Sequence, residues 1–500
     1  MGKHARPADQ MFRSSFFLLA STVTTAGLSF LFWVVVARFY PPEQVGLATS
    51  LISATSLLSY LSMFGLNSTL IRFPAEGRAR NGQITQSTAL VLLVSCGAAG
   101  IYLLGLPWYG HKLLFVRDHA HLAALFVLSC ACASLNLLVK SVFISARMAQ
   151  YNVLFDGILQ GLAKLAAPVA LAGFGAAGIL GSAGIGYAVA GAAALLLLRH
   201  RLGFRFDFRT RGTRLREQLR FSVASYVSSL INLAPVLITP LIVLQKLGAA
   251  EAGYYFVAFQ IAALLNSVST AVGEAVFAEV SSDPSRFGEL LRRSAKIIAA
   301  VQVPAVAVVA AGSGLLLMVF GGGYTTAARG LLGVLAVAAL PVALNTWACF
   351  GLKLAQRMKQ LIAANAVLAS TTIGLAAWWA PHGLVRVGCA WGIGNLAAGL
   401  FATAALLRGR PSAPRPPEPD ADPGPGPALV DTLPLRAVRL PGPTTAAPQS
   451  AAPPSAAAPS AAPQSAAAPS AAPPSAAPQS AAASSAAASS AAPPAERYRP

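Results

Sequence analysis

Apolar segments of membrane-spanning length follow one another from residue 14 to residue 407, separated by short polar gaps. A helix needs about 20 mainly apolar residues to cross the roughly 30 Å hydrocarbon core of a bilayer. Twelve segments meet this requirement, at residues 14–37, 44–66, 86–107, 120–139, 153–173, 177–198, 221–245, 253–278, 297–320, 328–350, 361–380 and 385–407. Since they leave no sequence for a soluble domain between them, the pattern predicts an all-α integral membrane protein with about 12 transmembrane helices.

Basic residues are concentrated in every second gap. If the N-terminus is cytoplasmic, the inside gaps hold Lys3, Arg6, Arg13, Arg72, Arg78, Arg80, Arg147, the arginines of residues 199–220, Arg286, Arg292, Arg293, Lys296, Lys353, Arg357, Lys359, Arg408 and Arg410. The outside gaps hold little more than Arg38, Lys112, Arg117, Lys246, Arg329 and Arg386. The positive-inside rule therefore predicts a multi-pass protein of the plasma (inner) membrane with both termini in the cytoplasm.

Composition and charge agree with this interpretation. The chain is 55% hydrophobic and 11% charged, with a mean hydropathy of +0.61, which is too apolar for a water-soluble protein. Its net charge of +20 lies in gaps between spans and not in a stripe with interleaved aromatics, so we expect no nucleic acid partner. The five cysteines lack paired spacing and are interpreted as small buried hydrophobic residues, so the sequence predicts neither metal nor disulfide. It also carries no catalytic motif, and we expect neither a cofactor nor an enzymatic activity.

The segments fall into two halves that resemble each other. Aligning Val36–Ala54 with Leu244–Ala262 brings Arg38 opposite Lys246 and Glu43 opposite Glu251. With six helices in each half, the two copies have the same orientation and enclose a central cavity, as in many transporters. We therefore expect four regions: an N-terminal six-helix lobe (1–198), a basic cytoplasmic linker (199–220), a C-terminal six-helix lobe (221–410) and a cytoplasmic tail (411–500).

The linker and the tail differ in character. The linker holds eight arginines, and Leu215 and Leu219 among them suggest a helix lying on the anionic inner leaflet. We interpret it as a determinant of topology, with recruitment of a polyanionic partner as the alternative. The tail is mostly Pro, Ala, Ser and Gly with imperfect SAAPQ and SAAPP repeats, a composition that predicts disorder. A spacer is its simplest interpretation, and recruitment of a synthetic enzyme is the alternative.

Several stretches resemble the polysaccharide-export flippases, whose superfamily also contains lipid II flippases and multidrug and toxin extrusion transporters. They are FRSSFFLLAS from Phe12, VVVARFYPPEQVGLATSLISATSLLSYLSMFGLNSTLIRFPAE ending at Glu76, GAAEAGYYFVAFQ from Gly248 and VFGGGYTTAARG from Val319. The resemblance covers roughly residues 10–410 and lies in the order of degenerate motifs. It implies two six-helix bundles that move a lipid-linked oligosaccharide from the inner to the outer leaflet.

The fifth segment carries the best candidates for substrate contact. Asn152, Asp156, Gln160 and Lys164 recur every four residues, which places them along one slowly drifting face of an otherwise apolar helix. A flippase needs cations for the phosphates of its substrate and polar groups for the sugar, so we predict that this face lines the cavity. An interhelical ion pair between Asp156 and Lys164, or a snorkelling lysine, is the structural alternative.

Other candidates are less specific. Glu274, on a face with Asn266 and Thr270, is either an ion-coupling carboxylate, as Asp156 could be, or an interfacial residue. Lys140 is either a phosphate ligand or a snorkelling side chain. Asn232, Pro235 and Pro240 predict a kinked seventh segment that could act as a gate. The tryptophans near segment ends, Trp33, Trp108, Trp378 and Trp379, are typical of an aromatic belt.

The sequence thus favours a flippase for a polyprenyl-pyrophosphate-linked oligosaccharide, a precursor of an envelope polysaccharide, that works by alternating access. Its expected partners are this lipid-linked glycan, membrane lipids and the glycosyltransferases or polymerase of the same pathway. A multidrug or cation antiporter of the same architecture would instead need cavity carboxylates with little fixed positive charge. A non-transporting scaffold for glycan assembly would have a closed, apolar interior.

Overall fold

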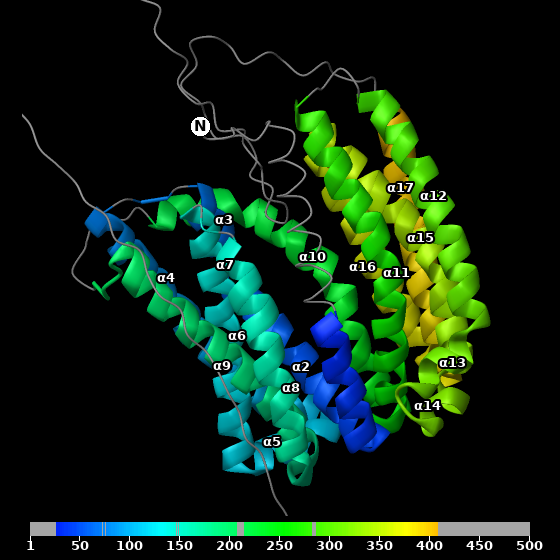
Figure 1. Cartoon of the computed structure of the whole chain (residues 1–500), viewed down its shortest axis with the longest axis horizontal. Helices are drawn as coiled ribbons and strands as arrows, with labels where there is room; N and C mark the ends of the chain where they lie inside the picture. The colour runs from blue at the N-terminus through cyan, green and yellow to red at the C-terminus, as the bar shows by residue number, and fades with distance from the viewer. Residues whose placement is uncertain are drawn as a thin grey trace, which may run out of the picture. The chain divides into compact units, whose positions relative to one another are not determined.

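The helices of the computed structural model follow the apolar segments of the sequence (Figure 1). The structure describes residues 27–72, 74–75, 77–146, 148, 150–207, 215–282 and 287–408, all within one unit, Met1–Arg436. Helices make up 92% of the described residues, which form no strand. Residues 1–26, the middle of the arginine-rich linker and the predicted tail lie outside the described residues.

In the described residues, the helix Gly27–Phe39 comes first. The first half continues with α2 (Pro42–Ser62), α3 (Leu66–Arg72), α4 (Gly77–Tyr109), η1 (His111–Leu113), α5 (Leu114–Asp118), α6 (Ala120–Ser145), α7 (Gln150–Asn152), η2 (Val153–Leu159), α8 (Gln160–Ala170), η3 (Ala172–Phe174) and α9 (Gly175–Leu202). The second half comprises α10 (Leu215–Leu247), α11 (Ala249–Ser282), α12 (Phe287–Ala311), α13 (Ser313–Met318), α14 (Gly322–Ala327), α15 (Arg329–Leu354), α16 (Met358–Trp379), η5 (Ala380–His382) and α17 (Leu384–Arg408).

Each of the predicted spans contains a helix. Eleven helices in the described part of the chain are long and apolar enough to cross a membrane, and the shorter Gly27–Phe39 helix occupies the described part of the first predicted span. The protein is therefore an all-α, multi-pass membrane protein; in the described residues the first half has five such helices and the shorter Gly27–Phe39 helix, and the second half has six.

Several boundaries differ from the prediction, and α4, for example, begins at Gly77 and not at residue 86. The ninth span begins ten residues before the predicted residue 297, because the basic residues Arg292, Arg293 and Lys296 continue α12 as polar helical turns. Residues 215–220 are the first turns of α10, and not a separate helix on the membrane surface. No glycine or proline lies between Thr213 and Pro235 to interrupt the helix, so it runs on into the seventh span.

The end of α9 has well-defined caps. Gly203 adopts a left-handed conformation with φ of 60° and donates its backbone N–H to Leu198 O. The guanidinium of Arg80, from α4, donates to Leu202 O at 2.7 Å, placing positive charge at the negative end of the helix dipole. Arg80 therefore ties α9 to α4 where the predicted linker begins.

One large cluster of buried apolar residues lies toward one end of the helices. This cluster joins both halves, since it includes Tyr40, Leu106 and Leu113 from the first and Tyr255 and Phe320 from the second. We call this region the joined end. Burial raises the pKa of Tyr40 there, and its hydroxyl donates to Pro168 O at 2.7 Å.

At the opposite end of the helices, each half has its own core. One cluster, with Leu138, Phe143 and Leu198, contains residues of the first half, and another, with Leu352, Leu361 and Leu406, contains residues of the second. We call this region the split end. The two halves thus share one hydrophobic cluster at the joined end and have separate clusters at the split end, where α10 of the second half also contacts α3 of the first.

The joined end is built around the crossing of α2 and α11, drawn in blue and green near the centre of Figure 1. Gly46 lies so close to Ala249 and Gly253 that a Cβ atom on Gly46 would overlap the Ala249 carbonyl oxygen, and a Cβ on Gly253 would overlap that of Pro42. Two backbones can approach this closely only where side chains are absent. The crossing joins the matching helices of the two halves, since α2 and α11 begin just before the aligned residues Glu43 and Glu251.

Candidate functional site

A pocket of about 200 Å³ lies where the fifth span of the first half faces the second half. Its wall combines residues of four first-half spans with one residue of α11, and the lining residues are Leu28, Ser29, Phe32, Trp33, Ile52, Gly157, Gln160, Gly161, Lys164, Ala183, Tyr187 and Phe256. Gln160 and Lys164, two residues of the predicted polar face, are both among them. We call this cavity the Lys164 pocket.

Lys164 is held by its neighbours on α9. Its Nζ lies 4.3 Å from the centroid of the Tyr187 ring, a cation–π arrangement. Its aliphatic stem packs against Gly186, where any side chain would collide with it. The ammonium group is therefore positioned within the membrane-spanning region by an aromatic face and a glycine.

Gln160 is a largely buried side chain, 8% exposed, on the same helix. Its Oε1 accepts a hydrogen bond of 3.5 Å from Asn136 Nδ2 on α6, which fixes the orientation of the amide. One helical turn separates Gln160 from Lys164, so an amide and a cation face the pocket together. Such a pair can bind a phosphate oxygen and a hydroxyl group at the same time.

Aromatic side chains form much of the remaining wall. Trp33 is 7% exposed and packs against Phe256 of α11 with ring centroids 4.2 Å apart. The prediction that Trp33 belongs to an aromatic belt is wrong, since it is buried between the halves. Trp108 and Trp378, at 82% and 69% exposed, do lie open near helix ends.

The predicted face does not continue as one straight α-helical stripe. Val153–Leu159 is a π-helix, with more residues per turn than an α-helix, so residues before it are rotated relative to Gln160 and Lys164. Asn152 does not line the Lys164 pocket, and its Nδ2 donates to Lys140 O at 3.2 Å. The Lys140 side chain is exposed and also lies away from this pocket.

The side chains of the two ion-coupling candidates, Asp156 and Glu274, lie outside the described residues. Their helices are described: Asp156 belongs to the π-helix and Glu274 to α11. Their predicted roles stay predictions.

The predicted gate lies on α10, which packs against α2 and α3 of the first half and α16 of the second. Tyr226 donates to Leu61 O in the first half, and six residues later Asn232 Nδ2 donates to Asn365 Oδ1 in the second half. Near the joined end, Pro240 O accepts a hydrogen bond from Ser50 of α2. Asn232, Pro235 and Pro240 thus lie on a helix that has hydrogen-bond partners in both halves. The helix bounds and Figure 1 show α10 as one continuous helix through these residues.

Sequence reasoning did not identify Trp33, Tyr187 or Phe256 as residues of the pocket. Each is an aromatic residue in an apolar segment, indistinguishable by pattern from a core or belt residue. The sequence offers one sign of the pocket, which is Gly186 beside Tyr187. That glycine is needed because the Lys164 side chain packs against it, a contact that the sequence does not reveal.

The chemistry of the described residues favours binding. Among them, no group of three His, Cys, Asp or Glu side chains is placed to hold a metal ion. The five cysteines are free thiols, and Cys96 is exposed in contrast to the predicted burial. What the Lys164 pocket offers is one cation, an amide and aromatic faces, a set suited to an anionic and polar ligand.

Solved structures of membrane transporters share this fold. The lipid II flippase MurJ in an inward closed conformation aligns with a TM-score of 0.69 and 11% identity, over 78% of this chain and 87% of that one. An inward-facing multidrug resistance MATE family transporter of the MOP superfamily aligns with a TM-score of 0.59 and 14% identity, over 77% and 94%. A MOP superfamily transporter from Pyrococcus furiosus aligns with a TM-score of 0.53 and 15% identity, over 77% and 93%. At these identities the likeness concerns the fold alone.

A search of curated proteins finds no match. The sequence profile of one family, described as polysaccharide biosynthesis protein, matches residues 11–278, which is more than half of the chain and contains all the residues that line the Lys164 pocket. With the shared transporter fold, this match identifies the chain as a member of the polysaccharide biosynthesis protein family.

Proposed function

We propose that the protein is a flippase that moves a polyprenyl-pyrophosphate-linked oligosaccharide from the inner to the outer leaflet by alternating access. Family membership supports a role in polysaccharide biosynthesis. One of the similar structures is named as a flippase of lipid II, so the fold is compatible with a lipid cargo.

The observation that carries the proposal is the position of Lys164. A pyrophosphate crossing hydrocarbon needs a cation to offset its lost hydration. Lys164 and Gln160 supply a cation and an amide at a pocket that is also lined by Phe256 of the second half. A ligand held there touches both halves, so its binding can be coupled to their relative movement.

The division between the joined end and the split end supports the direction of opening. Hydrophobic packing across the two halves at one end and separate cores at the other are expected of a transporter closed on one side. With the N-terminus inside, the split end is cytoplasmic, the side on which a lipid-linked precursor is made.

The test is an export assay in a strain that lacks its own flippase for the polymer. Lys164→Ala should reduce export at least about tenfold while the protein remains in the membrane, and Lys164→Arg should retain part of the activity because positive charge is the main requirement. Lys246→Ala, an exposed lysine outside the pocket, is the matched control and should export normally. Full export by Lys164→Ala would contradict the proposal.

A double change separates substrate binding from a purely structural ion pair. If Lys164 only neutralises Asp156, then Asp156→Asn combined with Lys164→Gln should restore the export lost by either single change, because neither charge remains unpaired. If Lys164 binds phosphate, the double variant should stay as impaired as Lys164→Gln. The antiporter alternative predicts a different result. If expression of the wild-type protein makes the strain resistant to drugs and does not change polymer export, the antiporter is favoured.

A separate experiment measures the orientation of the protein in the membrane. Lys112 and Arg205 are exposed residues at opposite ends of the first half, so a cysteine at either position should react readily. In intact cells, an impermeant thiol reagent should label Lys112→Cys and not Arg205→Cys. Labelling with the opposite pattern would reverse the proposed direction of transport.

A further inference from the structure

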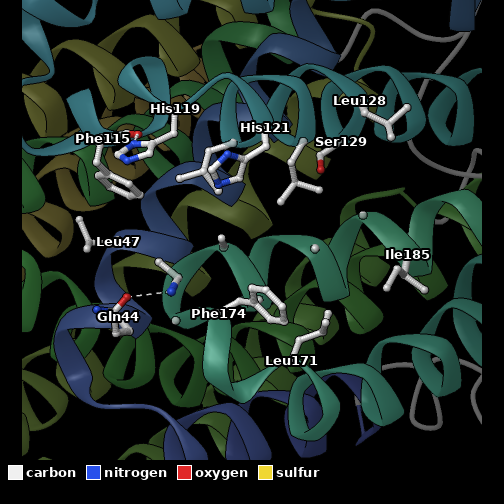
Figure 2. A pocket seen from close by; sticks show the side chains of 18 of the residues that line it. Gln44, Leu47, Phe115, His119, His121, Leu128, Ser129, Leu171, Phe174 and Ile185 are labelled. Carbon is white, nitrogen blue, oxygen red and sulfur yellow. Dashed lines mark hydrogen bonds between the residues drawn. The ribbon is translucent and has the colours of Figure 1, made fainter.

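One face of α6 changes in character along its length. Four residues of this face line a mainly apolar cavity of about 820 Å³ between α6 and α9, and they are Leu122, Leu125, Ser129 and Cys132. Figure 2 shows Ser129 on the α6 wall of this cavity. Asn136 follows four residues after Cys132, so it continues the same face. Where this face reaches the fifth span, it therefore carries an amide.

That amide acts on the Lys164 pocket from behind. Asn136 is buried, at 9% exposed, and is not among the residues that line the pocket. Its Nδ2 donates to Oε1 of Gln160, which does line the pocket. A polar side chain inside a membrane-spanning helix is costly and needs a specific partner. Gln160 is that partner, so Asn136 can influence a ligand only through the Gln160 amide.

The fifth span is bonded to α6 on both sides of its π-helix. Asn152 precedes the π-helix Val153–Leu159 and donates to Lys140 O. Gln160 follows the π-helix and accepts from Asn136. In a regular α-helix, residues eight apart point about 80° away from each other around the axis. The wider turns of the π-helix change this angle, and both residues contact α6. Such turns are frequent at functional sites, and this one ends where the Gln160 amide is held.

The aromatic side chains of the pocket already have partners within the protein. The ammonium group of Lys164 lies over the Tyr187 ring, and Trp33 packs against Phe256. A cationic ligand binds well to an open aromatic face. Among the described residues that line the pocket, the one charged side chain is Lys164. The pocket therefore favours an anion, provided that the amide beside Lys164 also presents hydrogen-bond donors.

We propose that Asn136 is a positioning residue of the Lys164 pocket, which holds Gln160 Oε1 toward α6, directs the Gln160 N–H group to the pocket and so makes the pocket select anions over cations. An amide carries its oxygen and its N–H group on the same carbon atom, so fixing one decides where the other points. The proposal deepens the proposed function, on which it rests for the pyrophosphate ligand.

The first test measures binding of geranyl pyrophosphate, a water-soluble lipid pyrophosphate, to the purified full-length protein by isothermal titration calorimetry. Asn136→Leu should weaken this binding about fivefold, because the Gln160 amide loses the bond that orients it. Tetraphenylphosphonium, a lipophilic cation, should bind the wild-type protein at least about tenfold more weakly than geranyl pyrophosphate. Equal binding of the two ligands, or no binding of geranyl pyrophosphate, would overturn the proposal.

A double-mutant cycle separates positioning from a general loss of stability. Gln160→Leu should weaken binding of geranyl pyrophosphate at least as much as Asn136→Leu does. The double variant should bind no more weakly than Gln160→Leu alone, because Asn136 then has no amide to orient. If Asn136 only stabilises the fold, the two losses should add, and that result would overturn the proposal.

Asn345→Leu is the matched control. Asn345 Nδ2 donates to Asn395 Oδ1 at 3.2 Å, a bond between two buried amides of the second half, and neither residue lines the Lys164 pocket. Loss of this amide pair should leave binding of geranyl pyrophosphate by the folded protein unchanged. A weakening equal to that of Asn136→Leu would show that any lost amide pair has this effect, and would overturn the proposal.

The export assay distinguishes failure of this proposal from failure of the proposed function. If the wild-type protein exports glycan and the losses in Asn136→Leu and Gln160→Leu add, Asn136 is not a positioning residue and the flippase proposal stands. If the losses do not add and the wild-type protein exports no glycan, the role of Asn136 stands and the proposed function fails.

Discussion

The joined end and the split end use the same kinds of residue in different ways. At the joined end, apolar side chains of both halves belong to one cluster, and the backbones of α2 and α11 touch at Gly46 and Gly253. At the split end, Phe143 and Leu352 belong to clusters confined to their own halves. Both arrangements bury apolar surface, but among the described residues the hydrophobic cluster that both halves share lies at the joined end.

This difference indicates where movement can occur. Each half keeps its own core at the split end, so the halves can approach there without losing buried surface. At the joined end, separation would expose the shared cluster unless new contacts form at the split end. Under the proposed alternating-access mechanism, each half would move as a unit, and the contacts between the halves would shift from the joined end to the split end.

The largest effect is expected from Gly46→Leu at the centre of the joined end. The new side chain would collide with the Ala249 carbonyl oxygen, and overpacking of this kind typically costs about 1–3 kcal/mol or more. We expect loss of export together with a lower melting temperature of the purified protein. Gly97→Leu, at an open position, should change neither, and normal export by Gly46→Leu would show that the joined end is not a tight interface.

The next largest effect is expected in the accessibility of the two ends to a water-soluble thiol reagent. Thr270 is exposed on α11 toward the split end, whereas Ser50 is fully buried near the joined end. In inverted membrane vesicles, an impermeant thiol reagent should label Thr270→Cys at least about tenfold faster than Ser50→Cys, since a polar exposed position borders water. Leu93→Cys is the control for a residue that faces lipid, since Leu93 is exposed on an apolar helix, and it should stay unlabelled. Equal labelling of Thr270→Cys and Leu93→Cys would mean that water does not reach the split end.

A smaller effect is expected for Arg38, which links the halves beside the joined end. Its guanidinium donates to Val319 O at 2.8 Å and to Met318 O at 3.2 Å, where α13 ends. Because Arg38 is exposed and solvent screens the interaction, Arg38→Ala should change the export rate only about two- to threefold. Lys246 is the residue aligned with Arg38 in the repeat, and Lys246→Ala is the control. A tenfold loss of export in Arg38→Ala would show that this contact is essential for holding the two halves together at the joined end.

The smallest effect is expected from removing residues 415–500. Their composition cannot form a packed core, so the deletion should leave membrane insertion and the labelling of Thr270→Cys unchanged. Quantitative blotting of the membrane fraction at matched transcript level measures this. Loss of the truncated protein would show that the tail supports the helical part.

The candidate site was predictable only in part. The four-residue spacing places Gln160 and Lys164 on one face, because an α-helix brings such residues together without help from the rest of the chain; both line the Lys164 pocket, and their role in substrate binding stays a prediction. It could not foresee the π-helix at Val153–Leu159, which separates Asn152 from them. That conformation depends on the packing around it and not on local propensity alone.

By itself, the sequence determined the spans and the all-α class. Hydropathy and helix length are local properties, and a bilayer leaves the backbone few alternatives to a helix. Only the tertiary structure decided which apolar residues meet. Trp33 and Phe256 are more than two hundred residues apart in the chain, yet their rings are in contact and both line the Lys164 pocket. In lipid, close packing and hydrogen bonding distinguish one helix face from another, and these are properties of pairs of helices that no single segment carries.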